Sequence, residues 1–269
     1  DDSELLRRLH TGDANEIMPP PEYNKPLTAK QKRVLESWIE AGGEFRSHWA
    51  FETPEKSEIP ASADHPVDYF IEAKIASMGL VPADRASDAA LLRRVCLDLT
   101  GLPPTREQIK RILEAKFDFE ATVDELLASP AFGQHIGRHW LDLVRYADTH
   151  GLHLDNYREM WPYRDWVIDA VNHNMPFDQF ITEQLAGALI PDATMAQKIA
   201  SGFNRLNVTT SEGGSIYDEV FARNVIDRTD AFGTIFMGLT TQCAVCHDHK
   251  FDPISQKDYY SLFAFFNSL

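Results

Sequence analysis

Hydrophobic residues recur three and four positions apart along most of the chain, which is the spacing of one face of an α-helix. Few stretches alternate with a period of two, as a half-buried strand would. We therefore predict an all-α fold. The stretches with helical spacing are 4–9, 28–39, 67–78, 88–99, 106–113, 120–127, 133–147, 161–172, 177–185, 195–204 and 219–237.

Capping and turn residues separate these stretches. Thr28, Asp88 and Thr105 are typical N-caps, because their side-chain oxygens can accept from the free N–H groups of a first helical turn. Turn signals stand at 42–43 (Gly-Gly), 100–104 (Thr-Gly-Leu-Pro-Pro), 129–130 (Ser-Pro) and 174–176 (Asn-Met-Pro).

A proline-containing segment indicates two domains. Pro54, Pro60 and Pro66 stand among Glu, Ser and Ala, a composition typical of an interdomain connection. We predict the end of a small domain over residues 1–46, a linker over 47–66, and one mostly helical domain over 67–269. The aromatic patch 48–51 (His-Trp-Ala-Phe) is expected to attach the linker to a domain surface.

Composition narrows the function classes. The chain has 269 residues, of which 43% are apolar, enough for one large core or two smaller ones. No apolar run approaches the roughly 18 to 20 residues that a transmembrane helix needs. The formal net charge of −15 disfavours phosphate backbones, so nucleic acid is excluded as a main ligand and basic partners are favoured.

The five residues at 243–247 carry the most specific chemistry in the chain. Cys243-Ala244-Val245-Cys246-His247 has the form C-x-x-C-H, which is the attachment signature of a c-type haem. Two thiols at this spacing can add to the two vinyl groups of one porphyrin, and His247 can then bind the iron. Half of a zinc site is the alternative, but a structural zinc site usually has two such pairs and the sequence holds one. Cys96, the third cysteine, is expected to be a buried thiol.

Met18 is a second candidate iron ligand. It precedes three prolines and a capped helix, as the axial methionine does in small cytochromes c. Alternatively, its side chain fills a gap in a small core. No attachment cysteines precede Met18, so a haem that it served would be attached to a segment absent from this chain.

Histidines gather on the predicted helix 133–147 and after it. His135 and His139 lie within one sector of the helix together with Asp142, and His150 and His153 follow. Such histidines commonly make structural hydrogen bonds, but beside a haem an imidazole is a candidate sixth ligand. The polar loop 207–214 suits contacts to haem propionates or to a substrate, and is equally compatible with an ordinary solvated connection.

Several motifs, in order, resemble the cytochrome c domains of planctomycetes and their relatives. The resemblance covers nearly all of residues 67–269, and residues 4–51 are similar to the end of the first cytochrome domain that precedes this one in such proteins. The motifs are 94–105 (RVCLDLTGLPPT), 138–142 (RHWLD), 145–148 (RYAD), 163–168 (YRDWVI), 243–253 (CAVCHDHKFDP) and 259–260 (YY).

The resemblance implies a cytochrome c-like helical fold built around covalently bound haem. It implies haem c held by Cys243, Cys246 and His247, Met18 as an axial ligand of a second haem c outside this chain, and further domains of a larger multi-domain protein. We rank His139 first as sixth ligand, because it lies in a resemblance motif, ahead of His135, then His150 and His153, with Met237 as the thioether option.

We expect an extracytoplasmic, periplasmic or cell-envelope, electron-transfer cytochrome that works with a redox partner protein, because covalent haem attachment takes place outside the cytoplasm. The alternative is a haem-dependent oxidoreductase acting on a small molecule such as a sugar, with acid–base residues from among His139, His150, Asp148 and Glu212. A haem-bearing scaffold that docks other envelope proteins is a third interpretation.

Overall fold

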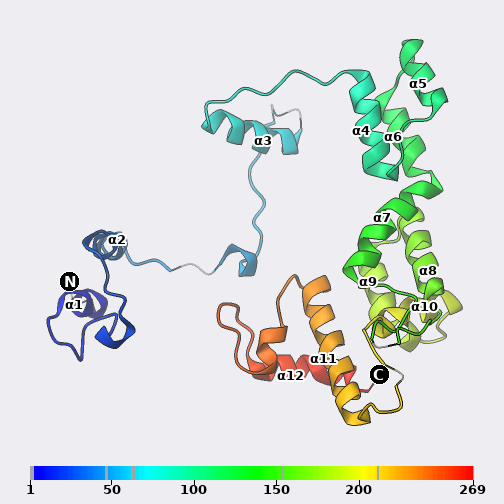
Figure 1. Ribbon diagram of the computed structural model, residues 1–269. Helices are drawn as coiled ribbons and strands as arrows, with labels where there is room; N and C mark the ends of the chain where they lie inside the picture. Colours follow the sequence, from blue (N-terminus) through cyan, green and yellow to red (C-terminus); the bar gives the residue numbers. More distant parts are fainter. Residues whose placement is uncertain are drawn as a thin grey trace. The chain divides into compact units, whose positions relative to one another are not determined.

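Helices account for the regular structure of the chain (Figure 1). The computed structural model describes residues 3–45, 48–61, 63, 65–152, 154–210 and 212–268. These ranges hold twelve α-helices and no strand, with isolated bridges only at Thr149–Tyr157 and Gly151–Thr209. The predicted all-α class is therefore confirmed. In the same ranges, no helix is both long and apolar enough to cross a membrane.

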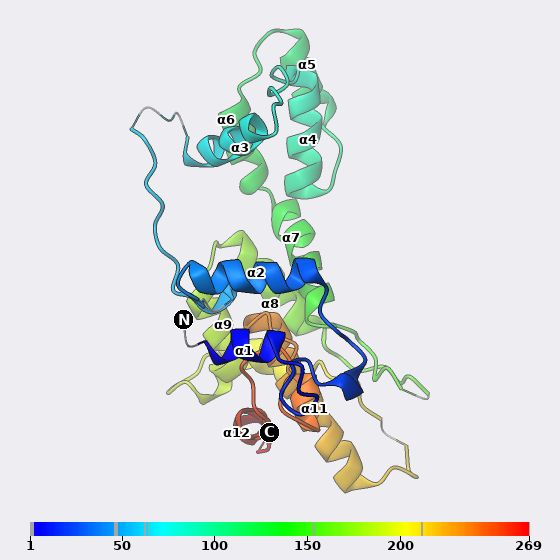
Figure 2. The same ribbon diagram turned by 90° about the vertical axis from the view of Figure 1, so that its left-hand side faces the viewer.

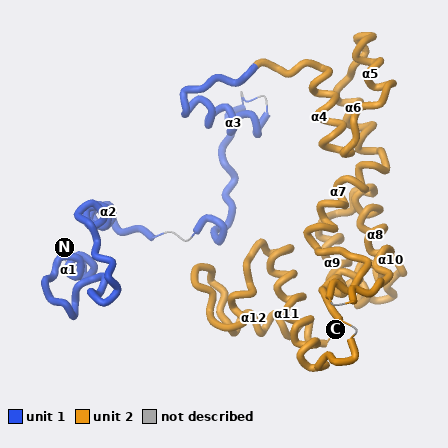
Figure 3. The backbone as a smooth tube through the Cα atoms, viewed as in Figure 1, with its two compact units in different colours: residues 1–83 blue, residues 84–269 orange. Residues whose placement is uncertain are grey.

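The chain divides into two compact units, residues 1–83 and 84–269 (Figure 3). The helix α3 (Pro66–Ser77) belongs to the first unit. The sequence-based division into 1–46, 47–66 and 67–269 stays a prediction. The two units are groups of residues that contact one another in space, and the boundary of such a group need not coincide with the boundary of a domain.

In the first unit, α1 (Glu4–His10) and α2 (Ala29–Glu40) are linked by polar contacts. Lys32 Nζ donates to Leu9 O, and His10 Nε2 lies 2.6 Å from Glu36 Oε1. Thr28 caps α2 as predicted. Short 3-10 helices lie at Pro21–Tyr23 (η1) and Trp49–Phe51 (η2), and in the latter both Trp49 and Phe51 are exposed.

The second unit begins with three helices that lie side by side (Figures 1 and 2) and share a small core. They are α4 (Asp88–Thr100), α5 (Arg106–Leu113) and α6 (Phe119–Leu127). Cys96 packs with Leu92 and Leu126 and is buried, as predicted. The cap of α4 is Ser87, so the prediction of Asp88 was wrong by one residue; Thr105 caps α5 as expected.

A larger aromatic core follows. It is built by α7 (Pro130–Leu143), α8 (Trp161–Asn172), α9 (Phe177–Ala186), α10 (Met195–Ala200) and α11 (Tyr217–Phe236), with η3 (Gly187–Leu189) and η4 (Ser201–Arg205) between them. α7 begins before the predicted 133 because Ser129 caps it and Pro130 occupies its first turn, where a proline needs no N–H partner. α7 and α8 approach closely because Gly133 and Gly137 face α8.

A buried amide ties this core together. Gln184 is fully buried, and its Oε1 accepts from Trp140 Nε1 at 2.9 Å and from Tyr163 OH at 2.5 Å. Its Nε2 donates to Phe180 O at 3.0 Å. Every polar atom of the side chain is thus paired, as a buried amide requires.

The last helix, α12 (Gln256–Phe266), was not predicted. A capping box begins it, because Ser255 and Asp258 pair reciprocally with each other's backbone N–H groups. Phe266 of α12 packs on Phe232 of α11, with ring centroids 6.0 Å apart.

We predict that Gly101→Ala destabilises the second unit. Gly101 ends α4 with φ of +68°, and an added Cβ would lie 2.4 Å from His135 Nδ1. The left-handed backbone costs about 1–2 kcal/mol for alanine, and the collision adds about 1–3 kcal/mol. Urea unfolding measures both.

Gly238→Ala is the matched control, because Gly238 has φ of +65° and open space around it. Its free energy of unfolding should fall by the backbone cost alone. Adding His135→Ala to Gly101→Ala should remove the collision and bring the loss of stability down to that of Gly238→Ala. Equal losses of stability in Gly101→Ala and Gly238→Ala would contradict the proposed collision.

Candidate functional site

The C-x-x-C-H segment follows α11 and forms the short 3-10 helix η5 (Gln242–Val245). Ala244 is fully buried, whereas Cys243, Cys246 and His247 are exposed. The buried alanine fixes the backbone, and the three side chains that carry the motif's chemistry remain accessible.

The close approach of Thr241 to α11 holds one side of the segment. A Cβ at Gly233 would lie 2.4 Å from Thr241 Cγ2, so only glycine admits this contact. Thr241 Oγ1 donates to Asp230 Oδ1 at 3.3 Å, and Thr241 O accepts from Ala244 N at 2.9 Å. The chain is therefore fastened to α11 directly before the first cysteine.

Helix α12 holds the other side. Val245 O accepts from Gln256 Nε2 at 3.1 Å and from Tyr260 OH at 3.0 Å. Asp248 Oδ1 accepts from Gln256 N at 2.7 Å, at the start of the helix. The backbone between the two cysteines and the residue after the histidine are thus bonded to the same turn of α12.

His247 and the nearby His249 differ in tautomer. His247 Nδ1 lies 2.8 Å from Asp248 O, and because a carbonyl only accepts, Nδ1 carries the proton and the neutral ring has its lone pair on Nε2. His249 Nδ1 instead accepts from Asp252 N at 2.8 Å, so the proton of its neutral ring is on Nε2. His247 is therefore the one of the pair that can offer Nε2 to a metal.

This arrangement fits a covalent haem. The donor set consists of two exposed thiols three residues apart and an imidazole oriented by a carbonyl, the usual partner of a metal-binding histidine. Met237, Phe251 and Tyr260, on or beside the segment, are exposed apolar side chains that a porphyrin could cover. Within the described ranges, no three His, Cys, Asp or Glu side chains are grouped as a metal site.

The other predicted ligands lie on separate elements. His139 is exposed on α7, where its ring contacts His135 at 5.4 Å between centroids and its Nε2 lies 3.4 Å from Arg138. The structure does not bring it into a described contact with His247. Met18 lies in the first unit, where its side chain is 39% exposed and its N–H donates to Arg8 O.

The structure describes two of the three remaining candidate sites, which are His150, His153 and the polar loop 207–214. The chain around His150 pairs with 156 and 209, through His150 N to Asn156 O and Thr209 N to His150 O, both 2.9 Å. His153 lies outside the described residues. In the polar loop, Asn207 is buried and bonds Asn224 at 2.9 Å, so the loop's start is structural.

A family comparison covers the whole second unit and also α3. Residues 66–269 match the family described as PSCyt2, protein of unknown function (DUF1549), a planctomycete cytochrome-type domain. The chain belongs to this family. Comparison with curated proteins gave no match, and comparison with solved structures gave none either. The resemblance inferred from the sequence motifs is confirmed over residues 66–269, and the likeness of residues 4–51 to the end of a first cytochrome domain stays a prediction.

Several PSCyt2-like motif residues are structural. Trp140, Tyr163 and Trp166 belong to the aromatic core, and Asp148 accepts from Tyr146 OH at 2.7 Å and from Met160 N at 2.9 Å. The Asp148 carboxylate is therefore occupied by hydrogen bonds at the start of α8. The motifs at 138–142, 145–148 and 163–168 mainly build the fold that carries the C-x-x-C-H segment.

Sequence reasoning missed the supports of the segment. Gly233, Thr241 and Gln256 hold it, yet none of them has unusual chemistry alone. The only signals were the glycine within a long helical pattern and the Ser255–Asp258 spacing before an apolar run.

We predict that Tyr259→Phe reduces the alkaline sensitivity of the fold. Tyr259 is 1% exposed on α12, and its burial, with the nearby charge of Asp230, raises its pKa to about 12 from the usual value near 10. Between these values the unfolded state has lost a proton that the folded state keeps. Stability therefore falls as pH rises from about 10 to 12.

Urea midpoints across this pH window should fall less steeply in Tyr259→Phe than in the wild type. Tyr217, on α11, is exposed, so Tyr217→Phe serves as the control and should retain the wild-type slope. Identical slopes in all three proteins would show that the buried phenol is not the group responsible.

Proposed function

We propose that this chain is a c-type cytochrome that transfers electrons, with haem attached through Cys243 Sγ and Cys246 Sγ and with His247 as the proximal ligand. The observation that carries the proposal is the exposure of all three side chains on a segment fastened to α11 and α12. The planctomycete cytochrome-type family supports it.

The residues have separate parts in this proposal. Each cysteine forms one thioether by adding its S–H across a vinyl group, so that sulfur bonds one vinyl carbon and the proton goes to the other, with no oxidant needed. His247 offers Nε2, and Asp248 O fixes its ring through Nδ1. The bound haem would supply a one-electron couple, whose potential depends on burial and axial ligands.

Location and partners follow from the same proposal. Covalent haem attachment takes place outside the cytoplasm, so we place the protein in the periplasm or cell envelope. The net charge of −15 favours a redox partner with a basic docking surface, because complementary charge accelerates encounter.

Two further ligand assignments are part of the proposal. His139, exposed on α7, is the proposed sixth ligand of this haem. Met18 is the proposed axial ligand of a second haem attached to a segment outside this chain. Neither assignment affects the roles of Cys243, Cys246 and His247.

The first test is covalent attachment. When the wild type is produced in cells that attach c-type haem, acid–acetone extraction should leave the haem, and therefore the colour, with the protein. Replacing both Cys243 and Cys246 with Ala should leave no covalent haem. Cys96→Ala is the control and should keep the haem, since Cys96 is buried away from the segment. Extraction of the wild-type haem would contradict the proposal.

The second test is the spin state of the oxidised iron. A histidine sixth ligand predicts a low-spin optical spectrum, and His139→Ala should make it high-spin and open to cyanide. His135→Ala, one turn away on α7, is the matched control and should stay low-spin. A low-spin spectrum in His139→Ala would refute this ligand.

A wild-type protein that is already high-spin would point to the alternative, a haem-dependent oxidoreductase acting on a small molecule such as a sugar. An open axial position suits the binding of a further ligand at iron, whereas two protein ligands suit electron transfer. The same spectrum therefore separates the two functions.

A further inference from the structure

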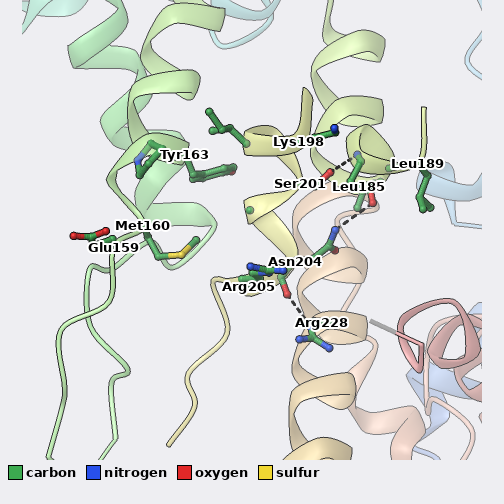
Figure 4. Close-up of a pocket in the computed structure, with 15 residues that line it drawn as sticks. Glu159, Met160, Tyr163, Leu185, Leu189, Lys198, Ser201, Asn204, Arg205 and Arg228 are labelled. Atoms are coloured by element: carbon green, nitrogen blue, oxygen red, sulfur yellow. Dashed lines mark hydrogen bonds between the residues drawn. The ribbon is translucent and has the colours of Figure 1, made fainter. Parts of the chain in front are cut away.

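A cavity of about 520 Å³ lies among α8, α9, α10 and α11 of the second unit (Figure 4). Its size is within the range of small-molecule sites in proteins. The apolar part of its wall includes Met160, Tyr163, Leu185 and Ile199. None of the residues of the C-x-x-C-H segment lines it, so it is separate from the proposed haem site.

Positive charge is concentrated at this cavity. Lys198, Arg205 and Arg228 line it, against a single acidic residue, Glu159, although the whole chain has a net charge of −15. Figure 4 shows Arg205 beside Arg228, with Lys198 set apart from them beyond Ser201. Across the described ranges, neither Arg205 nor Lys198 has an ion-pair partner.

Arg228 is held in place without a carboxylate of its own. Its Nε donates to Asn204 O at 2.8 Å, and the neighbouring Asp227 pairs with Arg145 at 3.1 Å. Burial, opposed by Asp227 and aided by the charge of Arg205, lowers the pKa of Arg228. A pair of adjacent guanidinium groups beside an apolar wall is suited to an anionic group, which would relieve their repulsion.

Asn204 holds the cavity wall in place through its side-chain amide. Its side chain is buried, with the residue 7% exposed, and its Nδ2 donates to Leu185 O at 3.1 Å, which ties this part of the cavity wall to α9. Its Oδ1 is buried and has no hydrogen-bond partner in the described part of the chain. Because that oxygen is covered by protein atoms, it is closed to a ligand in the cavity, and the arginines are left as the polar groups that a ligand would meet.

We propose that this cavity binds a small organic acid that has an apolar body. The carboxylate contacts Arg205 and Arg228, and the apolar body lies against Met160 and Tyr163. The proposal does not depend on haem, because the lining residues belong to the helical core.

Calorimetric titration of the full chain tests it with three probes of one shape. They are 3-phenylpropionate, its amide and 3-phenylpropylamine. We expect the acid to bind at least about tenfold more tightly than the amide, and the amine to show no binding.

Arg205→Gln is the informative variant, because Arg205 is exposed and its loss should leave the fold intact. It should weaken binding of the acid about tenfold and leave the affinity for the amide unchanged. Arg223→Gln, on α11 but not in the cavity wall, is the matched control and should bind as the wild type does.

Three results would overturn the proposal. These are equal affinities for the acid and its amide, an equal effect of Arg205→Gln and Arg223→Gln, and no saturable binding of the acid up to about 10 mM. Each is measured on protein whose far-ultraviolet circular dichroism matches the wild type, so a folding defect cannot produce them.

Discussion

The placement of the C-x-x-C-H segment depends on helix α11, which packs on the aromatic core and also on the segment and α12. Ala231 and Phe236 join the aromatic core, where Phe236 contacts Trp140 at 6.0 Å and Phe203 at 5.2 Å between ring centroids. Gly233 admits Thr241, and Phe232, whose ring also contacts Phe236, meets Phe266 of α12. The core therefore positions α11, and α11 positions the segment.

The dependence of the segment on α11 explains what the family motifs do in the structure. Trp140 and Tyr163 converge on the buried side chain of Gln184, whose amide would be unsatisfied if either α7 or α8 moved. Arg145, at the end of α7, pairs with Asp227 of α11. Motif residues far from the cysteines thus set the position of α11, the helix to which the C-x-x-C-H segment is fastened. The same helix places Arg228 in the wall of the cavity, so α11 serves both proposed sites.

The sequence pattern predicts most of the helices because their apolar residues fall on one face. It missed α12, although Tyr259, Leu262, Phe263 and Phe266 have the three-and-four spacing of one helical face, because the exposed aromatic residues Tyr260 and Phe265 interrupt the polar face. It also reads Pro130 as a turn, although a proline in the first turn begins α7. The three residues Cys243, Cys246 and His247 are identified by spacing alone. Their supports at Gly233 and Gln256 are not, because those contacts join residues whose side chains carry no signature.

The most direct test of the central claim is the mass of one peptide. Cleavage after Arg228 and Lys250 releases residues 229–250, which contain both cysteines of the segment, while cleavage after Arg94 and Arg106 releases residues 95–106 with Cys96. In protein made with c-type maturation, the account predicts that the first peptide carries the mass of one haem and the second carries none. An unmodified 229–250 peptide from such protein would contradict it.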